Sequence, residues 1–95
     1  MLFVWLCTDK PGSLDLRMKS RPEHIAYLES LGNKLKAAGP FTDDSGSPIG
    51  SMVIVEAADR AEATAMAKAD PYAKAGLFGS VEIKAWKWGL KNPEA

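Results

Sequence analysis

The first seven residues, Met1 to Cys7, are all apolar, and this run restricts the possible folds more than any other feature of the sequence. It is too short to cross a membrane, which takes about 20 residues. No basic segment precedes it and no small-residue cleavage site follows it, so it does not resemble a secretory signal. We therefore expect a buried β-strand. Because the side chains of a strand alternate between faces, both faces of its sheet must be apolar at this position.

A capping-box sequence follows this strand. In Ser20-Arg21-Pro22-Glu23, the serine side chain can accept a hydrogen bond from the Glu23 amide while Glu23 reaches back, and proline is tolerated in a first helical turn. We predict a helix over residues 20–31 that ends at Gly32, with a separate helical turn over residues 14–19.

Two more helix starts lie in the second half of the chain. Asp59-Arg60-Ala61-Glu62 opens an alanine-rich segment of high helix propensity, which predicts a helix over residues 59–69. Asp70-Pro71 places an N-cap residue before a proline at the first helical position. This dipeptide predicts a short third helix that ends at Gly76 or Gly79.

Three further segments have the alternation or the turn boundaries typical of strands. Residues 35–38 end at Gly39-Pro40, residues 51–57 follow a polar turn cluster, and residues 81–90 alternate apolar and polar side chains. The last of these precedes a polar tail, residues 91–95. The predicted order of the elements is therefore βαββαβ.

This order predicts an α+β fold of the ferredoxin-like kind, in which an antiparallel four-stranded sheet carries both main helices on one face. A chain of 95 residues has room for one core only, so we expect a single domain over residues 1–95. A domain this small buries a modest fraction of its surface, and an oligomer interface is an expected source of further stability.

The face of the sheet away from the helices also needs cover. The first strand carries Trp5 and the last carries Trp86 and Trp88, and we expect the three rings on this one apolar face. An apolar patch of that size is uncommon on a monomer, so it predicts a homodimer formed sheet to sheet. A ligand cavity lined by the same rings is the alternative.

Charge and cysteine usage argue against several partner classes. Basic and acidic residues number 12 each, and this balance lacks the basic surface that nucleic acid or an anionic membrane requires, so we expect neither partner. The single cysteine, Cys7, cannot form an intrachain disulfide, and we expect a buried inert thiol and a cytoplasmic location. His24 is the only histidine and no ligand set has zinc spacing, so we expect no metal and no cofactor.

His24 is the strongest candidate for chemistry on the predicted first helix. At about 100° per residue it shares the apolar stripe with Tyr27 and Leu28, so it should face the sheet. A carboxylate partner would suit it to general acid or base work, and Asp70 is the best candidate because it continues the core-facing row of the second helix. The alternatives are a packing histidine with satisfied ring nitrogens and an aspartate that only caps a helix.

Arg17 and Arg21 are four residues apart. They would share one helix face if the helical turn at residues 14–19 continued into the next helix, and together they could hold an anionic substrate. The alternative is a pair of arginines that are solvated or bound to Asp15 and Glu23.

Three segments resemble the YCII-related domain family, also called YciI-like proteins. Residues 17–24 resemble its arginine-rich approach to a helical histidine, and Ala38-Gly39-Pro40 resembles a second signature. Residues 69–77, which contain Asp70-Pro71-Tyr72, resemble the third and most specific one. The resemblance spans nearly the whole chain.

The resemblance implies a ferredoxin-like protomer, a dimer of the α/β-barrel type similar to muconolactone isomerase, and a site at His24 and Asp70. It also implies proton transfer or elimination on small ring-derived or halogenated acids, although most members are uncharacterised. We therefore expect a small dimeric enzyme of the lyase or isomerase type, in which His24 transfers a proton, Asp70 orients the ring, and Arg17 or Arg21 holds an anion. The competing class is a non-catalytic module for small-molecule binding or assembly.

Overall fold

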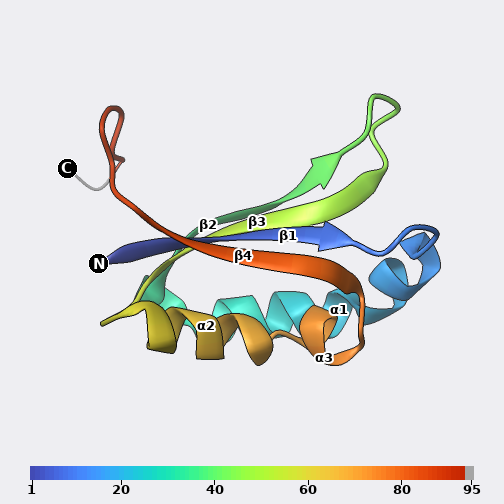
Figure 1. Ribbon diagram of the computed structural model, residues 1–95, viewed down its shortest axis with the longest axis horizontal. Coiled ribbons are helices and arrows are strands. Elements are labelled where there is room, and N and C mark those ends of the chain that lie inside the picture. The colour runs from blue at the N-terminus through green and yellow to red at the C-terminus, as the bar shows by residue number, and fades with distance from the viewer. Residues whose placement is uncertain (94–95) are drawn as a thin grey trace.

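The computed structural model describes residues 1–93, which form a four-stranded sheet covered on one side by helices (Figure 1). In chain order the elements are β1 (Leu2–Asp9), α1 (Leu14–Ser30), a 3₁₀ turn (Gly32–Lys34), β2 (Leu35–Thr42), β3 (Pro48–Glu56), α2 (Arg60–Lys68), α3 (Pro71–Lys74) and β4 (Phe78–Trp86). The predicted ferredoxin-like order is confirmed, with the short α3 inserted between α2 and β4.

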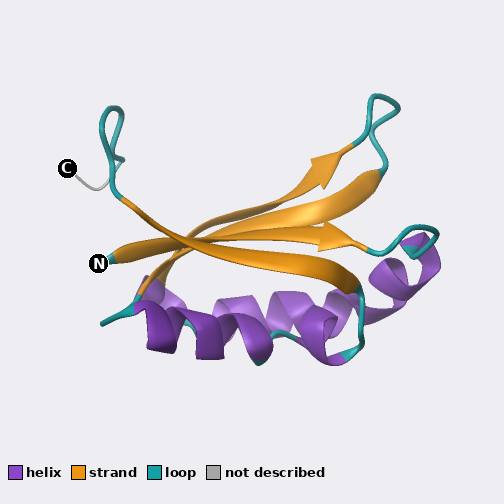
Figure 2. Ribbon diagram, viewed as in Figure 1, coloured by secondary structure: helices purple, strands orange, loops and turns teal. Residues whose placement is uncertain are grey.

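The strand β1 lies inside the sheet, and this position explains its uninterrupted apolar sequence. The strand order is β2-β3-β1-β4, and all neighbours are antiparallel. Trp5 of β1 pairs with Val53 of β3 on one side and with Ile83 of β4 on the other. Figure 2 shows all helices on one face of the sheet, while the other face is left open.

The face of β1 that meets the helices carries Phe3, Trp5 and Cys7, all buried in the core. Trp5 is only 1% exposed, so the expectation that it shares the outer face with Trp86 and Trp88 is wrong. Alternation identifies the two faces of a strand but not which of them the helices cover. Trp86 pairs with Leu2 on the outer side, and Trp88 lies beyond the end of β4 with its ring edge-on to Trp86.

The helix α1 is one continuous helix from Leu14, and not a turn followed by a helix that begins at Ser20. Pro22 lies inside it and lacks the N–H that would bond the carbonyl of Met18, but Met18 is exposed and water can serve that carbonyl. The buried side chains of α1 come from both sides of the proline, so packing against the sheet holds the two halves as one helix.

The strand bounds also differ from the sequence prediction. The strand β2 continues through Gly39-Pro40 to Thr42, because it is an edge strand and a proline there costs no interior hydrogen bond. The strand β4 runs from Phe78 to Trp86, so it begins and ends earlier than residues 81–90. Of the polar tail at residues 91–95, positions 94 and 95 lie outside the described residues. Within residues 1–93, no helix is long and apolar enough to cross a membrane.

Candidate active site

His24 and Asp70 are hydrogen-bonded to each other in the interior. The Nδ1 atom of His24 lies 2.8 Å from Oδ1 and 3.0 Å from Oδ2 of Asp70, whose residue is 1% exposed. Oδ1 also accepts a bond of 2.9 Å from the backbone N–H of Tyr72, so Asp70 caps α3 as well. The two interpretations of Asp70 from the sequence, helix cap and histidine partner, therefore apply to the same carboxylate.

The bond to Asp70 determines how the other nitrogen of His24 can act. An ionised carboxylate only accepts hydrogen bonds, so the proton of a neutral imidazole stays on Nδ1 and Nε2 carries the lone pair. No residue within 1–93 forms a hydrogen bond to Nε2. In this part of the chain the indole nitrogen of Trp5 is the only side-chain polar atom that is both fully buried and unpaired, so Nε2 is not sealed from solvent. A lone pair that is unpaired and accessible is the requirement for a general base.

The ring of Tyr72 contacts both His24 and Arg17. It stacks on the imidazole with ring centroids 3.8 Å apart and planes at 14°, and the Cζ atom of Arg17 lies 4.7 Å from its centroid. Burial raises the pKa of the Tyr72 hydroxyl, although the positive charges of Arg17 and Arg21 act in the opposite direction. The phenol is thus a neutral spacer between the imidazole and the guanidinium.

Arg17 is buried, and it forms a bidentate ion pair with Asp9 at the end of β1. Its Nε donates to Oδ2 of Asp9 at 2.7 Å, and its Nη2 donates to Oδ1 at 2.9 Å and to the hydroxyl of Ser51 at 2.8 Å. Burial alone would lower the pKa of Arg17, but the bonds to Asp9 and the charge of Asp9 outweigh it and raise that pKa. The Asp9 carboxylate therefore compensates the charge of the Arg17 guanidinium in the interior.

Arg21 lies one turn after Arg17 on the same continuous helix, and unlike Arg17 it is exposed. Within residues 1–93 no salt bridge engages its guanidinium. Both arginines line a cavity of about 200 Å³ together with His24, Ser51 and Tyr72, and residues 38–40 of β2 close one side of it. Such a volume suits one small ring, since pockets for drug-sized ligands take roughly 300–1,000 Å³.

The structure differs from the predicted alternative of one cavity lined by Trp5, Trp86 and Trp88. Trp86 lines a separate hollow of about 500 Å³ with Met1, Leu2, Ala85 and Lys87, and Trp5 is buried in the core. Cys7 is buried nearby, and burial, followed by the charge of Asp70, raises its pKa from 9.0 to about 12, which keeps the thiol protonated. Among residues 1–93, no three side chains of the His, Cys, Asp and Glu types are grouped to hold a metal ion.

Sequence reasoning did not identify Asp9, Ser51 or Tyr72 as parts of the site. Asp9 lies eight residues before Arg17, across the turn between β1 and α1, whereas Ser51 lies 34 residues after Arg17 and is brought beside β1 by its pairing with Cys7. Tyr72 had a signal, because it belongs to the Asp70-Pro71-Tyr72 segment and an N-cap aspartate fixes the position of the residue two places later.

The fold and the site define a ferredoxin-like α+β protein with a buried histidine–aspartate pair beside a small cavity. The chain belongs to the YCII-related domain family, whose sequence model matches residues 1–87. It is 40% identical to Protein YciI of Escherichia coli O6:H1, over 92% of this chain and 97% of that protein. It is 34% identical to an uncharacterized protein of Haemophilus influenzae over the same shares.

Two solved structures have a similar fold. The chain is 37% identical to a 5-chloro-2-hydroxyhydroquinone dehydrochlorinase (TftG) from Burkholderia phenoliruptrix AC1100, solved in complex with 2,5-dihydroxybenzoquinone. The TM-score is 0.86, and the match covers 94% of this chain and 96% of that one. An antibiotic biosynthesis monooxygenase matches with a TM-score of 0.54 at 17% identity over 92% of this chain and 99% of that one, which indicates a shared fold only.

Proposed function

We propose that this protein is a small dimeric enzyme that transfers a proton at a small anionic or ring-derived molecule. The observation that carries the proposal is the state of His24, with Nδ1 held by Asp70 at 2.8 Å while Nε2 is unpaired and the ring lines the cavity. Asp70 fixes the tautomer of the His24 imidazole, and its carboxylate stabilises the imidazolium that forms when Nε2 takes a proton. Arg21 supplies a free positive charge at the same cavity, and Arg17 adds a second cation behind Tyr72.

The chemistry that these groups support is elimination or isomerisation. Nε2 takes a proton from a carbon or oxygen of the substrate, and the electron pair left behind expels a leaving group or moves along the conjugated system. The imidazolium then returns the proton to the leaving group, to solvent or to another substrate atom, so the histidine ends as it began. The activity in the name of TftG, loss of hydrogen chloride from a hydroxylated ring, belongs to this reaction class and supports it.

The direct test is chloride release from 5-chloro-2-hydroxyhydroquinone, with binding of 2,5-dihydroxybenzoquinone measured in parallel by calorimetry. We expect the wild-type protein to bind the quinone and release chloride, and His24→Gln to lose chloride release by 100-fold or more, on the order of a missing general base. Ser20→Ala, a change on α1 outside the cavity, is the control and should match the wild type.

Binding of the quinone without turnover of the chlorinated ring would favour the competing class, a non-catalytic binding module. Absence of both binding and turnover would contradict a ring-derived substrate. A thermal-shift screen with small carboxylic acids, comparing the wild type with His24→Ala, would then test the wider class of small anions.

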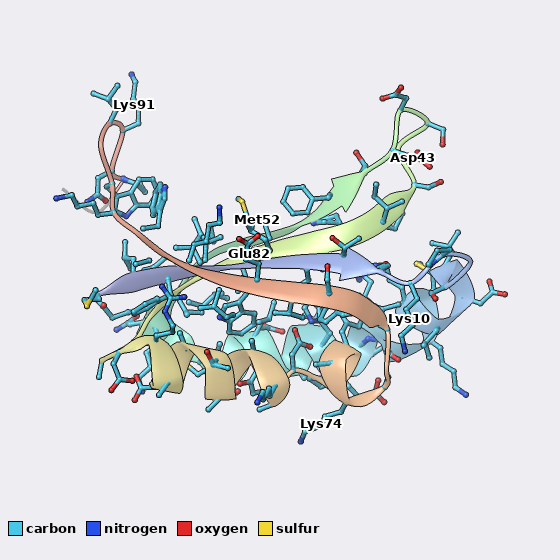
Figure 3. All side chains as sticks on the ribbon, in the orientation of Figure 1. Lys10, Asp43, Met52, Lys74, Glu82 and Lys91 are labelled. Atoms are coloured by element: carbon cyan, nitrogen blue, oxygen red, sulfur yellow. The ribbon has the colours of Figure 1, made fainter. Side chains whose placement is uncertain are left out.

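The dimer in this proposal forms through the open face of the sheet. The register places Leu6, Met52, Ile54 and Trp86 on that face, and Met52 and Trp86 remain more than a third exposed in the protomer. In Figure 3, Met52 and Glu82 lie on the side of the sheet away from the helices. The partner that fits is a second copy, because a twofold axis would set apolar residues against their equivalents. A cytoplasmic location, consistent with a free buried Cys7, completes the proposal.

A further inference from the structure

The hydroxyl of Ser51 is a buried polar group with one hydrogen-bonding capacity unused. Ser51 lies on β3, is 3% exposed, and lines the cavity that contains His24. Its Oγ accepts a bond of 2.8 Å from Nη2 of Arg17. Within residues 1–93, no group accepts a hydrogen bond from the Ser51 hydroxyl in return. Buried hydroxyls normally donate as well as accept, so this donor requires a partner.

Arg17 determines which role the hydroxyl can play. A guanidinium has no acceptor, so toward Arg17 the Ser51 oxygen can only accept. Arg17 cannot turn away, because Asp9 holds its Nε and Nη2 at 2.7 and 2.9 Å. A hydroxyl that accepts from a cation is polarised and becomes a better donor. Asp9 thus holds Arg17 in place, and the hydrogen bond from Arg17 makes the Ser51 hydroxyl a stronger donor toward a ligand in the cavity.

We propose that Ser51 determines substrate specificity by donating a hydrogen bond to an anionic oxygen of the substrate, while His24 exchanges a proton elsewhere on the same molecule. The ligand class is a small ring that bears an enolate or phenolate oxygen. Hydrogen bonds to an ionised acceptor are about twice as strong as those between neutral groups, so Ser51 favours the anion over a neutral ring of the same size. This assignment rests on the proposed function and adds the part of the substrate that is recognised.

Two probes of one ring size test the assignment. 2,5-Dihydroxybenzoquinone is anionic at pH 7 because each hydroxyl is conjugated to a carbonyl, whereas hydroquinone is neutral there, with a phenol pKa near 10. We expect Ser51→Ala to bind the quinone about 10-fold or more weakly by calorimetry, the effect of losing a hydrogen bond to a charged group, and to bind hydroquinone within about threefold of the wild type. Ser20→Ala, the control for the same substitution on α1 outside the cavity, should change neither affinity.

The ratio of the two affinities separates recognition from loss of structure. A Ser51→Ala protein that only disturbs the shape of the cavity would lose affinity for both probes equally, and an unchanged ratio would overturn the assignment while the proposed function stands. Ser51→Cys keeps the side-chain shape but offers a weak donor, so it should repeat the change in ratio even if Ser51→Ala folds poorly. If the wild-type protein binds neither probe, the proposed function fails for this ligand class and the role of Ser51 fails with it.

Discussion

The imidazole of His24 and the phenol ring of Tyr72 are stacked, with centroids 3.8 Å apart and planes only 14° from parallel. Tyr72 follows two residues after Asp70, the hydrogen-bond partner of the same imidazole. The one short helix α3 supplies both contacts, because Asp70 is its N-cap and Pro71 fixes its first turn. A four-residue helix that stabilises little by itself therefore sets both the tautomer and the plane of the histidine.

Replacing Tyr72 separates its ring from its hydroxyl. Tyr72→Phe keeps the stack on His24 and should keep most of the affinity for 2,5-dihydroxybenzoquinone. Tyr72→Leu loses the stack and the contact with Arg17, and we expect it to lower the free energy of unfolding by about 1–3 kcal/mol. Urea unfolding and calorimetry measure both quantities. Equal affinities and stabilities for Tyr72→Leu and Tyr72→Phe would show that the stacked ring of Tyr72 does not hold the His24 imidazole in place.

Asp70→Asn should change the tautomer of His24 with little change of shape. The amide of asparagine keeps an acceptor oxygen at the position that the backbone N–H of Tyr72 engages, and its NH₂ group takes the place of Oδ2, 3.0 Å from Nδ1. A donor opposite Nδ1 moves the imidazole proton to Nε2, so the lone pair no longer faces the cavity. The ¹⁵N chemical shifts of the ring nitrogens report the tautomer directly. An Nδ1–H tautomer retained in Asp70→Asn would remove the role given to Asp70.

The buried ion pair between Asp9 and Arg17 predicts a large loss of stability when one partner is removed. Asp9→Ala leaves the Arg17 cation uncompensated in the interior, and we expect a loss of about 3–5 kcal/mol. Asp15→Ala is the matched control, because Asp15 is an exposed carboxylate in the first turn of α1 on the helical side, where its charge is worth at most about 1 kcal/mol. Chemical denaturation of both variants gives the comparison, and similar losses would mean that Arg17 reaches water once Asp9 is gone.

The sequence predicted the element order and the candidate residues of the site, but not the contacts that hold them. Caps such as Asp59 and Asp70 are local signals, and the structure has both caps at the predicted residues. The ion pair of Arg17 with Asp9 depends on how the turn at residues 10–13 sets α1 against the end of β1, and sequence spacing favoured Asp15 and Glu23 instead. Trp5 was misplaced because an apolar strand inside a sheet has the same pattern on its covered face and on its open face.

The thiol of Cys7 makes stability depend on pH in the alkaline range. Its pKa is about 12 in the folded protein, against 9.0 without burial. Below pH 9 the thiol is protonated in both states, whereas above pH 9 the unfolded chain releases a proton that the folded chain retains, so stability falls as pH rises toward 12. Between pH 9 and 10 the wild type should lose about 1 kcal/mol more than Cys7→Ala. Parallel slopes for the two proteins over this interval would mean that water reaches the thiol.

A charge at the centre of the open sheet face should dissociate the proposed dimer. Met52 pairs with Leu6 of β1 and lies on the outer side, where Glu82 also lies (Figure 3). Met52→Glu would bury an unpaired carboxylate in a sheet-to-sheet interface, which costs several kcal/mol, while the isolated protomer leaves it in water.

Sedimentation at micromolar concentration should therefore give a dimer for the wild type and a monomer for Met52→Glu. Leu14→Glu is the matched control, because Leu14 is an exposed apolar residue at the start of α1 on the helical side, and it should remain dimeric. A wild-type protein that sediments as a monomer would exclude the sheet-to-sheet dimer. A Met52→Glu protein that stays dimeric would move the interface to the helical side, where Leu14→Glu would be the variant that weakens it.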